Sequence, residues 1–146
     1  MILENIHCLL QFDDRGNLLA LVSKSSGRNY IVKDGCSLFR LTMTEIIKNR
    51  VMPGTLALTG DMAEQIDFIQ QSQCLEIDYR NLDGMPVTVK CTIGFMDEEI
   101  HWNILIENKT RFAVSEIEYP VLLFKPYLGF NAESERILLP KMDGIL

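Results

Sequence analysis

The sequence predicts an antiparallel β-sandwich of about ten short strands with little helix. Short stretches in which apolar and polar residues alternate recur along the chain. Turns rich in Gly, Asp and Asn separate them at spacings of about 8 to 12 residues. The chain has no internal repeat, low-complexity tract or convincing linker. With 146 residues and 47% apolar composition, residues 1–146 are expected to form one domain with a full core.

The chain is expected to open with a β-hairpin. Residues 7–13 (HCLLQFD) and 18–24 (LLALVSK) form its two strands, and residues 13–17 (DDRGN) tolerate the left-handed backbone of a turn. The turn resembles a calcium-binding loop only superficially, because the alternating oxygen ligands and the distant bidentate Glu are missing. A second turn at residues 25–29 leads to a short strand at residues 30–32, before the break at residues 33–35.

The next segments contain one clear strand and two ambiguous elements. Residues 37–44 alternate, with Phe39, Leu41 and Met43 on the expected core face. Residues 44–48 resemble the start of a helical turn, which Pro53-Gly54 would soon end. In residues 61–71, Asp61 and Glu64 imitate a helix capping box, but Ile66 and Phe68 alternate with polar neighbours. Strand is the preferred interpretation there.

A meander of three antiparallel strands is predicted for residues 74–108. Leu75, Ile77 and Tyr79 define the apolar face of its first strand, and the turn at residues 81–84 (NLDG) precedes the second strand. Pro86 is tolerable at the start of that strand, whose apolar face comprises Val87, Val89, Cys91 and Ile93. The polar faces of all three strands are expected to meet water.

The third meander strand, residues 98–108, shows the strongest alternation in the chain. Its apolar face comprises Ile100, Trp102, Ile104 and Ile106, and a polar break at residues 108–110 follows. Residues 112–124 then form a second strand, so the two are interpreted as a hairpin. Within residues 112–124 the apolar phase changes, as a β-bulge or a strand that crosses between two sheets would produce. A last short strand is expected at residues 137–139.

Charge and hydropathy exclude two kinds of partner. The formal charge is −6, and the 14 Lys and Arg residues are dispersed, so a nucleic-acid partner is not expected. No stretch of about 18 apolar residues predicts a membrane-spanning helix. The N-terminus does not resemble a signal peptide, which predicts a cytoplasmic protein unless the chain is a piece of an exported one.

The cysteine pattern does not predict a metal site. Cys8, Cys36, Cys74 and Cys91 are far apart, with no CxxC pair and no nearby pair of histidines. They are therefore expected to be reduced and mostly buried thiols. No metal or other cofactor is expected.

Two groups of ionisable residues, a pair of glutamates and a histidine beside a glutamate, are of types that can act in catalysis. Glu116 and Glu118 lie two residues apart on a strand, which separates their Cα atoms by about 6.5–7 Å, and paired carboxylates can hydrolyse glycosides. The alternative is that both decorate the wet face of an outer strand. His101 beside Glu99 or Glu107 is the one histidine and carboxylate pairing suited to acid and base chemistry, although a surface role is preferred. No catalytic residue is therefore assigned.

Trp102 and Tyr127 are the candidate carbohydrate-binding residues, because aromatic faces can stack on sugar rings. Trp102 is in phase with three isoleucines, which favours core packing. Tyr127 lies in a loop between Pro126 and Gly129, where it is better exposed. Asn108-Lys109-Thr110 matches a glycosylation sequon by pattern only, and a tight turn explains it without glycosylation.

Short motifs distributed over nearly the whole chain resemble a known family. They are Ser25, Gly27, Arg28 and Tyr30 after the first hairpin, Asn108 before its turn, the pair Tyr119-Pro120, and the late Pro140 and Gly144. This pattern resembles the N-terminal β-supersandwich domain, similar in fold to galactose mutarotase, that precedes the catalytic barrel in certain glycoside hydrolases. A complete mutarotase-type sandwich is roughly twice this length by ordinary sheet dimensions.

The resemblance implies a non-catalytic accessory domain, the N-terminal part of a larger carbohydrate-active protein, that braces a neighbouring catalytic domain. The expected partner is that catalytic domain or a second copy of the chain. A stand-alone carbohydrate-binding module is the first alternative, and a small mutarotase-like sugar epimerase is the second. A bracing domain should expose an apolar patch, whereas a binding module should show a groove with two or more exposed aromatic residues.

Overall fold

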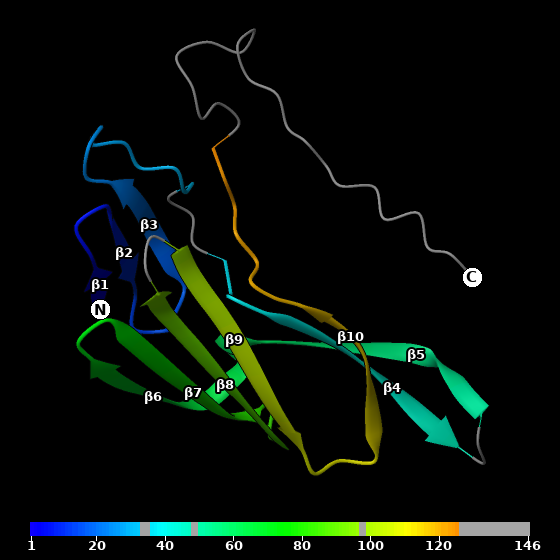
Figure 1. The fold of residues 1–146 in the computed structure, drawn as a ribbon. Helices are drawn as coiled ribbons and strands as arrows, with labels where there is room; N and C mark the ends of the chain where they lie inside the picture. Colours follow the sequence, from blue (N-terminus) through cyan, green and yellow to red (C-terminus); the bar gives the residue numbers. More distant parts are fainter. Residues whose placement is uncertain (33–35, 48–49, 97–98, 126–146) are drawn as a thin grey trace, which may run out of the picture.

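The computed structural model describes residues 1–32, 36–47, 50–96 and 99–125. These residues form ten strands in three antiparallel sheets, with one 3₁₀ turn at Gly60–Met62 and no α-helix (Figure 1). The predicted all-β, antiparallel β-sandwich is therefore confirmed. The predicted strand at residues 137–139 and the loop residue Tyr127 lie outside the described residues.

The first sheet is a three-stranded meander. It contains β1 (Ile2–Glu4), β2 (Cys8–Phe12) and β3 (Leu18–Ser23), in the order β1-β2-β3. The predicted opening hairpin is β2-β3. Its turn is closed by the Asp13 carboxylate, which accepts hydrogen bonds from the backbone N–H groups of Arg15 at 2.9 Å and Asn17 at 2.8 Å. Tyr30–Val32 does not form a strand, and only the isolated bridge between Ile31 and Phe124 forms there.

The four-stranded sheet has the order β6-β7-β8-β9 and contains the predicted meander. Its strands are β6 (Ala63–Gln71), β7 (Cys74–Leu82), β8 (Met85–Met96) and β9 (Glu99–Asn108). The preference for strand over helix at residues 61–71 is confirmed from Ala63 onward. The β7-β8 turn places Asn81, Asp83 and Gly84 at positive φ, a conformation that Asn, Asp and Gly tolerate best.

The third sheet, β10-β4-β5, corrects two predictions. The expected helical turn at residues 44–48 is wrong, because β4 (Arg40–Ile47) continues through most of it and pairs with β5 (Arg50–Thr59). The expected hairpin between residues 98–108 and 112–124 is also wrong. β10 (Phe112–Glu118) follows β9 in the chain but pairs with β4.

A turn and a bulge explain how the chain crosses between the two sheets. The Asn108 side chain accepts a hydrogen bond from the Thr110 N–H at 2.9 Å and donates one to the Phe112 carbonyl at 2.6 Å. The β10-β4 register then shifts between Val114 and Glu116. The bulge therefore explains the predicted phase change, whereas the change of sheet takes place before β10 begins.

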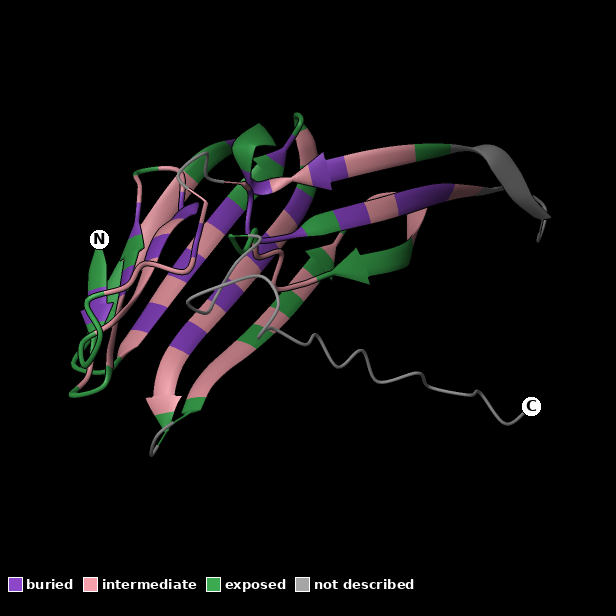
Figure 2. Ribbon diagram, turned by 90° about the horizontal axis from the view of Figure 1, so that it is seen from above, coloured by how far each residue is buried: buried purple, intermediate pink, exposed green. Residues whose placement is uncertain are grey.

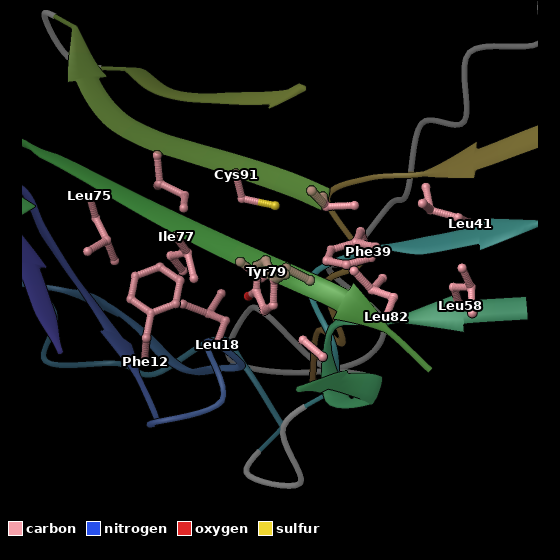
Figure 3. Packing of buried hydrophobic residues seen from close by; sticks show 14 of the residues in the cluster. Phe12, Leu18, Phe39, Leu41, Leu58, Leu75, Ile77, Tyr79, Leu82 and Cys91 are labelled. Atoms are coloured by element: carbon pink, nitrogen blue, oxygen red, sulfur yellow. The ribbon is translucent and has the colours of Figure 1, made fainter. Parts of the chain in front are cut away.

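The core lies on the inner face of the four-stranded sheet, where buried residues of both three-stranded sheets meet it. In Figure 3, Phe12 and Leu18 lie near Ile77 and Tyr79, whereas Leu41 and Leu58 lie toward Leu82. One cluster of buried residues joins all three sheets. The predicted core face of β4 is confirmed, since Phe39, Leu41 and Met43 are fully buried.

Tyr79 stands at the centre of this core. Its ring meets the Phe39 ring edge to face at 5.1 Å, and its hydroxyl donates a 3.4 Å hydrogen bond to the Gly16 carbonyl. Gly60 packs against the same ring, and its N–H donates to the Ser37 hydroxyl at 2.6 Å. The first turn, the 3₁₀ turn and β7 therefore depend on one another through a single side chain.

Candidate functional site

The outer face of the four-stranded sheet carries paired charges. Arg80 bonds Asp78 at 2.9 Å and approaches Asp67 at 3.4 Å, and Lys90 bonds Glu76 at 3.0 Å. These bonds raise the pKa values of Arg80 and Lys90 above their usual range, so both side chains stay cationic. A shallow hollow of about 240 Å³ lies among these charges. A ligand there would compete with existing ion pairs, which fits the predicted solvated face better than a binding site.

His101 lies on the same outer face, beside a second hollow. Gly94 lies between His101 on β9 and Cys74 on β7 in one cross-strand row, and its missing side chain leaves part of a space of about 280 Å³. The His101 Nε2 lies 3.5 Å from a Glu99 carboxylate oxygen. Glu107 is six residues further along the strand, about 20 Å away by strand rise. Of the two predicted pairings, the structure forms the one with Glu99, at an exposed position.

The two glutamates of β10 are surface residues. Glu116 accepts a hydrogen bond from the Thr42 hydroxyl at 3.5 Å, and Glu118 lies 3.8 Å from Arg40. Both glutamates are exposed. These contacts support the interpretation that the pair decorates an outer strand rather than flanking a bound sugar.

Of the two candidate carbohydrate-binding residues, Trp102 lies within the described residues and Tyr127 does not. Trp102 is partly buried, and its ring meets the Tyr119 ring edge to face at 6.4 Å. It packs against the core, as its phase with the isoleucines predicted. Tyr127 lies outside the described residues, so its role in carbohydrate binding stays a prediction.

All four cysteines are free thiols, but the expectation that most are buried is wrong. Cys91 alone is buried, whereas Cys8, Cys36 and Cys74 are partly exposed. Burial raises the pKa of Cys91 to about 12. Burial also raises the pKa values of Cys8 and Cys36. A neutral thiol is a poor nucleophile, so Cys91 acts as a small apolar residue of the core.

The described residues contain neither a cluster suited to a metal ion nor a helix suited to a membrane. No group of three or more His, Cys, Asp or Glu side chains there is placed to hold a metal ion. Within the same ranges, no helix has the length and apolar character needed to cross a membrane.

The apolar margin is an exposed surface whose position the sequence did not predict. We use this name for Ile117, Leu123 and Phe124, three exposed side chains in β10 and the segment that follows it. Ile117 pairs with Leu41 and is 50% exposed, although Leu41 is fully buried. Phe124 bridges Ile31 and is 47% exposed, although Ile31 is buried. At both places, therefore, a buried core residue is paired with an apolar side chain that no described residue covers.

The phase change in residues 112–124 was the sequence signal for this margin. It marks the point at which the apolar residues of the strand stop alternating in register with those of the neighbouring strand. Comparison of the chain with family models and with curated proteins finds no match.

Proposed function

We propose that the chain is a non-catalytic structural domain of a larger carbohydrate-active protein, and that its apolar margin packs against a neighbouring catalytic domain. The margin is the observation that supports this role. Two cross-strand pairs, Leu41 with Ile117 and Ile31 with Phe124, each join a buried apolar residue to an exposed one. Such pairs are typical of a core that a neighbouring domain completes.

The carbohydrate-active character of the parent protein rests on the family resemblance. Part of that resemblance is the turn around Gly27, whose N–H donates to the Ser23 carbonyl at 2.8 Å. Gly27 has φ of +67°, which favours glycine at this position of the motif. The glycoside hydrolase parent and the bracing role are both inferences from these two sources.

The margin also favours the bracing role over a stand-alone carbohydrate-binding module. Such a module should present at least two exposed aromatic side chains in a groove. Among the large apolar residues exposed in the described ranges, Phe124 is the single aromatic one. Trp102 is engaged with Tyr119, which leaves the expected stacking platform to Tyr127 outside the described ranges.

The first test is the reading frame downstream of Leu146. A continuous extension that encodes a catalytic barrel supports the proposal, whereas an immediate stop contradicts it.

The second test is a matched pair of substitutions in the polypeptide that joins this chain to its neighbour. Ile117→Lys and Ile69→Lys change the same residue type at similar exposure, 50% and 49%. Ile69 lies on the outer face of β6, away from the margin. We expect both variants to leave the isolated chain folded. In the joined polypeptide, Ile117→Lys alone should lower the unfolding temperature of the catalytic domain. Equal effects of the two substitutions would contradict docking through the margin.

The two rival functions have direct assays. A binding module should show heat of binding to polysaccharides in calorimetry with the isolated chain. An epimerase should accelerate anomer interconversion, followed by polarimetry, and His101→Ala should abolish the activity. A null result in both assays is expected from a bracing domain.

A further inference from the structure

β9 is a long strand at one edge of the four-stranded sheet that the structure describes. Within the described chain, β9 (Glu99–Asn108) pairs with β8 and ends the sheet order β6-β7-β8-β9. The β8-β9 ladder runs without a register shift from Val87 opposite Asn108 to Met96 opposite Glu99. In an antiparallel edge strand of ten residues, about five turn their backbone N–H and C=O groups away from the sheet. β9 therefore presents a straight row of backbone donors and acceptors.

The edges β1, β5 and β10 carry features that hinder pairing with another chain, whereas β6, like β9, has no register shift, Pro, Lys or Arg. β1 is only three residues long, and the Gln70 side chain of β6 donates to the Ile2 carbonyl beside it. β10 has a register shift, and the sequence of β5 includes Pro53. Short strands, bulges and Pro are the usual means by which proteins block edges. β9 has no bulge, and its sequence contains no Pro, Lys or Arg.

The burial of the β9 side chains also indicates that this edge of the sheet is incompletely covered. The inner-facing residues of the adjacent strand β8, such as Val89 and Ile93, are fully buried. The corresponding residues of β9, including Trp102 and Ile104, are only partly buried. No residue of β9 is fully buried, so this edge strand carries no purple in Figure 2. Leu105, on the outer face, is exposed. A strand added beside β9 would cover apolar surface on its inner side as well as satisfy its backbone groups.

β9 is self-complementary in one antiparallel register. When two copies pair about a twofold axis at Ile104, His101 of each copy faces Glu107 of the other. On the inner face, Trp102 faces Ile106 of the second copy. The register centred on Asn103 instead places Glu99 opposite Glu107, which is unfavourable for like charges. A shift by one residue pairs inner with outer side chains. Of these three registers, the one centred on Ile104 keeps the inner side chains together and avoids a like-charge pair.

We propose that β9 pairs antiparallel with β9 of a second copy of this chain, forming a twofold dimer with a continuous eight-stranded sheet. The dimer buries the unpaired backbone row of β9 and forms two equivalent contacts between His101 and Glu107. This inference does not depend on the proposed function, because the apolar margin on β10 and the segment after it takes no part in the contact.

The test measures the dimerisation constant of the purified chain by sedimentation over a wide range of concentration. His101→Glu places a carboxylate opposite Glu107 twice in the dimer. Two like-charge cross-strand pairs should weaken dimerisation by on the order of tenfold. The double variant His101→Glu with Glu107→Lys restores opposite charges and should recover most of the affinity. Gln71→Glu adds the same charge at an exposed position on β6, the opposite edge, and should change the constant little.

Circular dichroism shows whether each variant is folded, and amide hydrogen exchange locates the contact. Protection of β9 amides should rise with protein concentration, while protection in β7 stays constant. A monomer at every concentration would overturn the proposal. So would a dimer that His101→Glu does not weaken, or one in which concentration-dependent protection falls outside β9.

Discussion

Substitution of Gly16 tests how closely the first turn packs against the Tyr79 ring. A Cβ atom at Gly16 would lie 2.2 Å from the Tyr79 hydroxyl oxygen, a distance that requires movement of the ring or the turn. Gly16 also has φ of +77°, so an alanine there is strained irrespective of the space. Gly16→Ala therefore combines a backbone cost with an overpacking cost.

Gly27→Ala separates the two costs. Gly27 has φ of +67°, but its added Cβ would meet nothing within 4 Å. We expect Gly27→Ala to cost about 1–2 kcal/mol, the usual penalty for alanine in the left-handed region. Gly16→Ala should cost the same amount plus about 1–3 kcal/mol for overpacking. In a chain of this size each kcal/mol lowers Tm by about 2–4 °C, so thermal and urea unfolding resolve the difference.

Tyr79→Phe, combined with each glycine substitution, tests whether the Tyr79 hydroxyl causes the overpacking cost. It removes the hydroxyl oxygen, after which the nearest ring atom to the added Cβ, Cζ, lies at 3.0 Å. The excess cost of Gly16→Ala over Gly27→Ala should therefore fall in the Tyr79→Phe background. Equal destabilisation by the two glycine substitutions in the natural chain would refute the close packing of Tyr79 against the first turn.

Two further predictions concern pH and the first turn. The pKa of Cys91 rises from 9.0 to about 12 in the fold, so above pH 9 the unfolded chain loses this proton first. The free energy of unfolding should then fall by about 1.4 kcal/mol per pH unit between pH 9 and 12 from this thiol, and Cys91→Ala should make the decline measured by urea unfolding shallower. Asp13→Ala removes the acceptor of the Arg15 and Asn17 backbone N–H groups and should cost about 2 kcal/mol. Asp13→Asn keeps an acceptor oxygen and should cost less; equal losses would contradict this account of the turn.

The strands of the meander were predictable because their information is local. Alternation of apolar and polar residues in β7, β8 and β9 specifies both the extended backbone and the face that meets the core. Asp13 and the glycine of the β7-β8 turn specify where the chain reverses. The same pattern correctly placed Trp102 on the inner face.

The partner of each strand and the cover over each face were decided by the tertiary structure. Alternation in β10 is compatible with either β9 or β4 as its neighbour, and only the long-range ladder between Val114 and Met43 shows which strand it joins. For the same reason, the sequence of β9 did not reveal that Trp102 would be only partly buried. Burial depends on how many layers cover a face, and edge status depends on which strands pair. Both are properties of contacts between segments far apart in the chain, so local patterning specified the strands and tertiary packing specified the exposed margin and the free edge.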